Sequence, residues 1–412
     1  MRAEISEATE KCARQRFSLR LGLRLHPKYE RKGREMHIKA RNMETILAHA
    51  QQLVYTLLSL MPTQYQKDNL EAMLGLFLSA QGHPLPEHSK TKSASALSRF
   101  LNVNRWSTRS CIRTVRNYVL KQVLSECPKG RRPFLQVIID LTTLEKCGKF
   151  KEFEHLISVY NGKRGLHLVV LYLVVGRWRI PWSFRVWRGK GTPSPAQLGL
   201  KLVLGLPNAL TKHFQVMILV DTGFGSADFL HGIRKLKYHG ISGVRGDRQL
   251  VDGRRLTDLH KRGQQVRLVG LKFPVSVSWY YLKRDGKLEK RFVLSTKPFK
   301  ASTINWWGKR RWQIEGWFKT AKHRFGLHRF GQGTLLGVYR WLVLSLIAYL
   351  VAHWAYLSTN SRDLPDWGQA ALAALESILP QILVFLLLLD LERIIPLARS
   401  YGFDIHISRC KI

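Results

Sequence analysis

The chain has 412 residues, of which 67 are Lys or Arg and 28 are Asp or Glu, so its formal net charge is +39. Such a charge indicates a polyanionic partner, with nucleic acid as the first candidate and an anionic membrane surface as the second. Because 45% of the residues are hydrophobic and the basic residues are interleaved with aromatic ones, the composition excludes a basic disordered tail. It predicts two or three folded domains with basic faces.

The cysteines and the N-terminus bear on the compartment. An odd number of cysteines is scattered along the chain without zinc-ligand spacing, which fits a reducing cytoplasm. They are Cys12, Cys111, Cys127, Cys147 and Cys410. The N-terminus has no apolar segment followed by a small-residue cleavage site, so no signal peptide is expected. We therefore expect a cytoplasmic protein.

The first 128 residues are basic and lack strand patterns. Residues 1–40 are expected to be a flexible basic arm, which either lies on DNA or is an extension without a role. Residues 41–128 are predicted to form an all-helical DNA-binding domain. Its expected helices are Met43–Met61, Lys67–Gln81, Ala94–Leu101 and Trp106–Leu124.

The last two of these helices flank a short turn and fit a helix-turn-helix. In that arrangement Arg109, Arg113 and Arg116 recur at i, i+4 and i+7 along the second helix and face DNA. A small helical bundle with a solvated basic side fits the same pattern equally well.

An α/β core is predicted after the Pro- and Gly-rich boundary at Pro128–Pro133. The apolar runs Phe134–Asp140 and Phe214–Val220 have the length of buried strands, and each leads to an acid, Asp140 or Asp221. Two more strands and two helices are expected around them. They are the strands Leu166–Val175 and Ile180–Val186 and the helices Pro195–Leu204 and Ser226–Tyr238.

Residues 241–300 alternate β-branched and aromatic residues with polar ones, which is typical of antiparallel hairpins. Lys309–Gly326 then predicts one amphipathic helix. Its apolar stripe consists of Ile314, Trp317, Phe318, Ala321 and Phe325. A second face carries Arg311, Glu315, Lys319 and Lys322. A ladder of i,i+4 ion pairs on a solvated helix is the alternative interpretation of that face.

Two C-terminal segments resemble membrane spans. Leu335–Leu357 is apolar but contains Arg340 and His353, and the apolar run Ile378–Leu389 is too short to cross a bilayer core of about 30 Å. We predict that both are buried core helices. A membrane protein is the alternative.

Three acids suggest a shared site. Groups at the carboxyl ends of neighbouring strands converge on one rim of an α/β sheet, so Asp140 and Asp221 are expected to be neighbours, within reach of Glu315 from a packed helix. Clustered carboxylates stay ionised when divalent cations lie between them, and oxygen ligands select Mg²⁺ or Mn²⁺. Two such ions per site are the usual apparatus for attack on a phosphodiester. Alternatively, Asp140 is a turn residue and Asp221 forms an Asx-turn.

Two motifs give this pattern a family resemblance. Arg311, Glu315 and Lys322 have the Arg-x3-Glu-x6-Lys spacing, and Asp221 begins the box Asp-Thr-Gly-Phe. Both resemble motifs of DDE transposases of bacterial insertion sequences, in particular insertion-sequence family four. The chain departs from the family where the signature tyrosine would be Gly308 and where the arginine of the second motif is Thr222.

The resemblance implies an RNase H-like core at 134–240 and 301–350, a β-rich insertion at 241–300 and a C-terminal helical region at 351–412. It implies a cut-and-paste DNA transposase in the bacterial nucleoid. Paired molecules would cleave element ends with two Mg²⁺ or Mn²⁺ ions, form a hairpin, and transfer strands into target DNA. Arg311 and Lys322 would hold phosphates, joined by Lys319 on the same face.

The family further implies a tryptophan that stacks a flipped base. Trp279 is the candidate for that role, and a buried core tryptophan is the alternative. Two other functions compete with transposition. One is an RNase H-like nuclease or resolvase without strand transfer, and the other is a non-catalytic DNA-binding descendant of a transposase.

Overall fold

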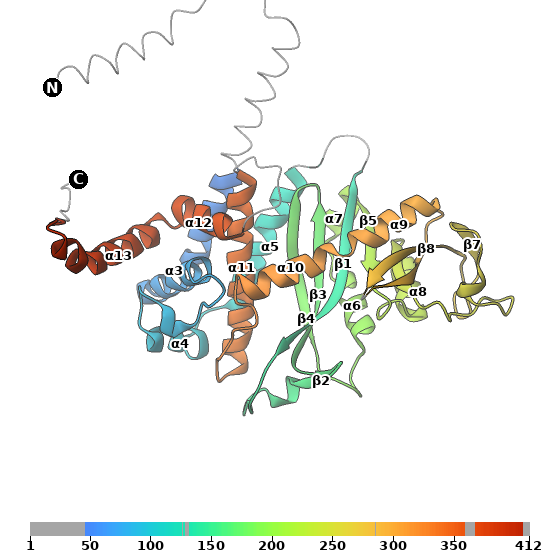
Figure 1. Cartoon of the computed structure of the whole chain (residues 1–412), viewed down its shortest axis with the longest axis horizontal. Helices are drawn as coiled ribbons and strands as arrows, with labels where there is room; N and C mark the ends of the chain where they lie inside the picture. Colours follow the sequence, from blue (N-terminus) through green and yellow to red (C-terminus); the bar gives the residue numbers. More distant parts are fainter. Residues whose placement is uncertain (1–45, 126, 128–131, 285, 359–366, 407–412) are drawn as a thin grey trace, which may run out of the picture. The chain divides into compact units, whose positions relative to one another are not determined.

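The computed structural model describes residues 46–125, 127, 132–284, 286–358 and 367–406 (Figure 1). The predicted basic arm at 1–40 and most of the boundary at 128–133 lie outside these ranges. The part from Ile46 onward forms one compact unit.

Helices make up the N-terminal part of that unit. Residues 46–59 are helical, and they are followed by α3 (Gln64–Ser79), η1 (Pro86–His88), α4 (Ala94–Asn102) and α5 (Thr108–Ser125). The side chains of Thr63 and Ser93 cap α3 and α4 by accepting hydrogen bonds from backbone N–H groups of the first turn. The pair α4–α5 occupies the segment predicted to be a helix-turn-helix.

A nine-stranded mixed sheet follows, in the order β2-β3-β1-β5-β6-β9-β8-β7, with β4 also paired to β3. The strands are β1 (Phe134–Glu145), β2 (Ser158–Tyr160), β3 (Lys163–Val175), β4 (Trp178–Trp187), β5 (Gln215–Val220), β6 (His239–Val244), β7 (Gln264–Val266), β8 (Val275–Arg284) and β9 (Lys287–Ser295). Strands β1, β3 and β4 form an antiparallel meander, and β5 and β6 run parallel to β1. This mixed α/β arrangement has the strand order of an RNase H-like core.

The hairpin region is continuous with the core. Strand β9 pairs with β6, and β8 and β7 continue the same sheet beyond it. The predicted start of the insertion at residue 241 therefore falls inside β6, which is a strand of the core.

Helices cover both faces of the sheet. The helices between the strands are α6 (Pro195–Leu204), α7 (Asn208–His213) and α8 (Ala227–Lys235), and α9 (Ala301–Arg310) and α10 (Gln313–His323) follow the last strand. Ile139 packs against Gly199 of α6, where an added Cβ would lie 3.2 Å from it. On the opposite face Gln136 accepts a hydrogen bond from Arg310 of α9. Since side chains alternate along a strand, Asp140 also lies on the face of α9 and α10.

The prediction of a single helix at Lys309–Gly326 is wrong, because the chain breaks between α9 and α10 at Arg311 and Trp312. Both break residues keep right-handed helical backbone angles. The Gln313 side chain donates to the carbonyl of Arg310, which satisfies an acceptor at the end of α9. The predicted apolar stripe is nevertheless buried as a set.

The C-terminal part contains α11 (Leu335–Ser358), α12 (Trp367–Ile378) and α13 (Pro380–Ser400). Helix α11 is long and apolar enough to cross a membrane, but 78% of its most apolar window is buried against other elements, including α3, α4 and α12. Helices α12 and α13 are long and apolar enough to cross a membrane only as a pair, and they are bent by 107° at their junction. The prediction of a buried core helix at Ile378–Leu389 is wrong for its greater part, because no residue of α13 is buried.

Candidate active site

The strand register brings two of the three predicted acids together. The parallel pairing of β1 with β5 runs up to the partners Ile139 and Val220. Asp140 and Asp221 directly follow these two partners, so they lie side by side where the pairing of β1 with β5 ends. The sequence predicted that the strand ends at Asp140, but β1 continues to Glu145 as the partner of β3.

Arg311 connects the third acid to the first. Its guanidinium donates from Nη1 to Asp140 Oδ2 at 2.9 Å and from Nη2 to Glu315 Oε1 at 2.8 Å. The Asp140 and Arg311 side chains are 13% and 16% exposed, whereas Glu315 is 46% exposed. The break between α9 and α10 places Arg311 at this point, and the first turn of α10 presents Glu315. One i,i+4 ion pair of the alternative interpretation, Arg311 with Glu315, therefore exists, but it is part of a contact with the sheet instead of a solvated ladder.

Asp221 has a different environment. Its Oδ1 accepts a hydrogen bond from the backbone N–H of Gly223 at 2.9 Å, so the Asx-turn that was the alternative interpretation of Asp221 is present. Its side chain lines the same cleft as Arg311 and Glu315. The Asx-turn engages one carboxylate oxygen and holds the group in place at the end of β5.

The pKa of Asp140 reflects its burial and the charged groups around it. Burial is the main cause that raises the pKa of Asp140 to about 7; Arg311 opposes the rise, and the neighbouring Asp221 and Glu315 carboxylates add to it. The Leu141 N–H also donates to its Oδ1 and favours the ionised form. A carboxylate in this position has a strong tendency to gain a cation or a proton.

The three carboxylates present the oxygen donors that Mg²⁺ and Mn²⁺ prefer. Among the described residues, however, no three Asp, Glu, His or Cys side chains converge closely enough to hold one ion as they stand. Arg311 occupies the space between Asp140 and Glu315. The donor chemistry thus fits a divalent cation, and binding one requires the guanidinium to leave at least one carboxylate.

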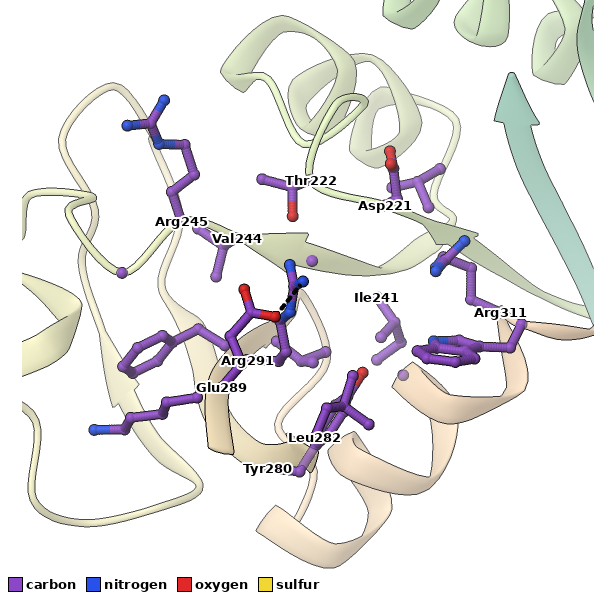
Figure 2. A pocket seen from close by; sticks show the side chains of 18 of the residues that line it. Asp221, Thr222, Ile241, Val244, Arg245, Tyr280, Leu282, Glu289, Arg291 and Arg311 are labelled. Atoms are coloured by element: carbon purple, nitrogen blue, oxygen red, sulfur yellow. Dashed lines mark hydrogen bonds and ion pairs between the residues drawn. The ribbon is translucent and has the colours of Figure 1, made fainter. Parts of the chain in front are cut away.

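A cleft of about 990 Å³ extends from Asp221 and Glu315 to the hairpin β8–β9. Asp221 and Arg311 lie at one end of it and Arg245 at the other (Figure 2). Further cations line it, and the exposed indole of Trp312 stands beside Arg311. These cations are Lys283, Lys290 and Arg291, the last of which is paired with Glu289. This basic lining was not predicted from the sequence, because alternating residues in the hairpin strands do not indicate which of them face the acids.

Lys319 and Lys322, the other two cations of the predicted basic face, differ from each other in burial. Lys319 is exposed on α10, whereas Lys322 is partly buried and donates to the carbonyl of Thr143 on β1 at 2.9 Å. Burial lowers the pKa of Lys322. Lys322 therefore braces α10 against β1 close to Asp140.

Gly308 stands in the position of the signature tyrosine and is explained by packing. A Cβ at this position would lie 3.1 Å from Val293 of β9 and 3.7 Å from the ring of Tyr280. Tyr280 itself lines the cleft. The adjacent Trp307 is buried and packs edge-on against Phe134, so it points away from the cleft.

Trp279 is buried, with 5% of its surface exposed, and Lys290 and Arg262 lie over its ring. The structure therefore favours the core interpretation of this tryptophan over base stacking. On α5, Arg109 and Arg113 are exposed, but Arg116 is half-buried with its guanidinium over Trp182 of β4. The three arginines predicted to form one DNA-facing row thus separate into two exposed residues and one packing residue.

Comparison with known proteins identifies one family. The sequence profile described as "Transposase DDE domain" matches residues 132–351, which is more than half of the chain. No curated protein matches. Among solved structures, the cryo-EM structure of the piggyBac transposase synaptic complex with hairpin DNA is 12% identical, with a TM-score of 0.44 over 83% of this chain and 79% of that chain. The sheet, the cleft and the profile match lead to one conclusion: the chain belongs to the transposase DDE domain family.

Proposed function

We propose that the chain is a DNA transposase that cleaves the ends of an insertion sequence and transfers them into target DNA. The observation that carries the proposal is the juxtaposition of Asp140 and Asp221 by the register of β1 and β5, with Glu315 joined to Asp140 through Arg311. Family membership makes DNA transposition the natural use of such a site.

Asp140, Asp221 and Glu315 would hold Mg²⁺ or Mn²⁺, which when bound would activate the attacking oxygen and stabilise the leaving oxygen. Arg311 is in position to exchange a carboxylate for a DNA phosphate, because its planar fork matches both groups. Lys322 would hold α10 against β1, and Glu315 would thereby be kept at a fixed distance from the two aspartates.

DNA is the polyanion that the charge of +39 favours. The cleft cations would guide the backbone of the DNA strand toward the acids, and the exposed Lys319, Arg109 and Arg113 would contact phosphates outside the cleft. Base stacking is not assigned to Trp279, since cations already lie over its ring.

Several finer features rest on the resemblance to insertion-sequence family four. They are cleavage through a hairpin on the element end, pairing of two molecules on DNA, and action on the chromosome of a bacterium in its cytoplasm. Gel analysis under denaturing conditions distinguishes a hairpin end from a linear one, because a hairpin runs as a single strand of double length.

The test uses a donor plasmid that carries the gene together with the DNA flanking it in its genome. Wild-type protein with Mg²⁺ is expected to release the element and join it to a second plasmid. Asp140→Ala, Asp221→Ala and Glu315→Ala are each expected to reduce cleavage at least about 1,000-fold and to retain binding in gel-shift assays, since cations dominate affinity.

Asp228→Ala is the matched control, because Asp228 is an exposed acid of the first turn of α8 outside the cleft. It is expected to cleave like the wild type. Near-normal cleavage by any of the three acid variants would remove that residue from the site. Cleavage without joining would instead identify a nuclease or resolvase.

A further inference from the structure

A cavity of about 400 Å³ lies between α5, β4 and α11, apart from the cleft beside the acids. Small-molecule sites in proteins have volumes of about 300–1,000 Å³ and mostly apolar walls. Both helices contribute apolar side chains at helical spacing, so each turns one apolar stripe toward the cavity. These side chains are Ile112, Val115 and Val119 of α5 and Val343, Ile347 and Leu350 of α11.

The polar groups of the cavity gather near the beginnings of the two helices. Burial raises the pKa of Tyr339, and Arg116 and Arg109 oppose that rise, so both cations act on its hydroxyl. Val119 lies about 15 Å beyond Arg109 along α5, and Leu350 lies about as far beyond Tyr339 along α11. All five residues line the cavity, which therefore has a cationic end and an apolar end.

Arg116 is the unsatisfied group of this cavity. Its guanidinium carbon lies 5.4 Å from the ring centre of Trp182, and its Nε is buried without a hydrogen-bond partner among the described residues. Burial lowers the pKa of Arg116, so the cation is partly desolvated. No described residue that lines the cavity is Asp or Glu. Because a desolvated charge without a partner costs free energy, the cavity favours a ligand that brings an anion.

The lining also selects the rest of the ligand. DNA is a poor fit, since the apolar walls would desolvate its closely spaced phosphates. An uncharged apolar molecule would leave Arg116 without a partner, whereas a carboxylate matches the planar fork of a guanidinium. The ligand that fits both ends is a small molecule with an apolar chain and one carboxylate.

We propose that this cavity binds an amphipathic monocarboxylate. Its apolar chain lies between the stripes of α5 and α11, and its carboxylate accepts hydrogen bonds from Arg116 at the cationic end. The bound molecule joins α5, from the helical N-terminal part, to β4 of the sheet. The proposal is independent of the catalytic assignment, since none of the three acids takes part, and its test contains no DNA.

Isothermal titration calorimetry of the full chain in moderate salt tests the site, with decanoate as the probe. We expect one decanoate to bind per chain, with a dissociation constant on the order of 10–100 μM. Decanol supplies the chain without the charge, and acetate supplies the charge without the chain. Each is expected to bind at least about 10-fold more weakly, because each satisfies only one end of the cavity.

Two variants locate the binding. Arg116→Met removes the guanidinium and keeps the apolar stem, and it is expected to weaken decanoate binding at least about 10-fold. Leu346→Trp keeps Arg116 and fills the cavity from α11, where Leu346 is half-buried, with the same expected loss. It decides the question if Arg116→Met fails to fold. Lys121→Met is the matched control, because Lys121 is an exposed cation of α5 outside the cavity lining.

The control is expected to bind decanoate like the wild type. A wild type that does not bind decanoate one-to-one overturns the proposal. So does decanol that binds as tightly as decanoate, or a decanoate affinity that is unchanged in either folded variant. An equal loss of affinity in Lys121→Met would show that decanoate responds to the overall charge of the chain, and would overturn the proposal as well.

Discussion

Arg311 and Arg340 are two largely buried arginines with opposite surroundings. Arg311 donates to two carboxylates beside an open cleft. Arg340 of α11 is 2% exposed and has no carboxylate partner among the described residues. It donates instead to the carbonyls of Phe100, Leu101 and Trp106 and to the hydroxyl of Thr108.

The difference separates a structural charge from a functional one. Arg340 satisfies the carbonyls at the end of α4, where the helix dipole favours a cation, and thereby fixes α11 to the α4–α5 pair. Its guanidinium makes four hydrogen bonds to uncharged acceptors and also lies over the ring of Trp106. Around Arg311, burial and crowding raise the pKa of Asp140 to about 7, so this region gains when a cation or a proton arrives. A site under such electrostatic tension is suited to exchange partners.

Replacing each arginine by Met tests most directly whether Arg340 is structural and Arg311 is not. Arg340→Met leaves several buried acceptors without donors and is expected to lower the free energy of unfolding by about 3–5 kcal/mol. Arg311→Met is expected to lower it far less, since Asp140 can take up a proton. Urea unfolding followed by circular dichroism measures both. Equal losses would show that Arg311 is as structural as Arg340.

The same variants should have the reverse order in chemistry. Losing Arg311 misplaces the reacting phosphate, which is expected to slow single-turnover cleavage about 100-fold while DNA binding stays nearly normal. At a temperature where it remains folded, Arg340→Met should cleave at close to the wild-type rate. A fast Arg311→Met enzyme would contradict the phosphate role and support a simple ion-pair function.

The raised pKa of Asp140 predicts how stability depends on pH without divalent metal. In the unfolded chain this carboxyl ionises near pH 4, but in the folded protein its pKa is about 7. The contribution of Asp140 to the free energy of unfolding is therefore fully present below pH 4 and is lost as the pH rises through 7. Asp140→Asn should raise the free energy of unfolding by about 1–2 kcal/mol at pH 8 in EDTA, and by less at pH 5. An equal effect of Asp140→Asn at pH 5 and pH 8 would show that the pKa of Asp140 is not raised.

The smallest effect is expected from the N-terminal arginines. Arg113 is exposed on α5, so Arg113→Gln should reduce the slope of log affinity against log salt by about one unit. Arg116 is packed over Trp182, so Arg116→Gln should leave the slope unchanged and lower the thermal midpoint. Identical behaviour of the two variants would mean that α5 does not contact DNA through its exposed side.

The sequence predicted much of the core because local patterns there agree with the tertiary environment. The continuous apolar runs before Asp140 and Asp221 have the length of buried strands, and the residue pattern of α10 matched its buried stripe. It could not predict the break at Arg311, because the residues of α9 and α10 continue one helical period across it. Nor could it predict that Arg116 and Trp279 pack inward. Arg116 packs on Trp182 of the distant strand β4, and Lys290 reaches the ring of Trp279 only through the pairing of β8 with β9.

The prediction of a buried core helix at Ile378–Leu389 was wrong for a related reason. Hydropathy alone predicts burial, but burial depends on whether another element is available to cover each face. The chain supplies a partner for the side of Ile382 and none, in the part that the structure describes, for the side of Leu391.

The central claim is that Asp140, Asp221 and Glu315 act as one metal site although Arg311 now lies between two of them. Titration of Mn²⁺ followed by electron paramagnetic resonance tests it without DNA or turnover. We expect the wild type to bind Mn²⁺, and Asp140→Asn, Asp221→Asn and Glu315→Gln each to weaken binding at least about 10-fold, with Asp228→Asn unchanged. Mn²⁺ affinity that is the same in all four variants as in the wild type would contradict the account.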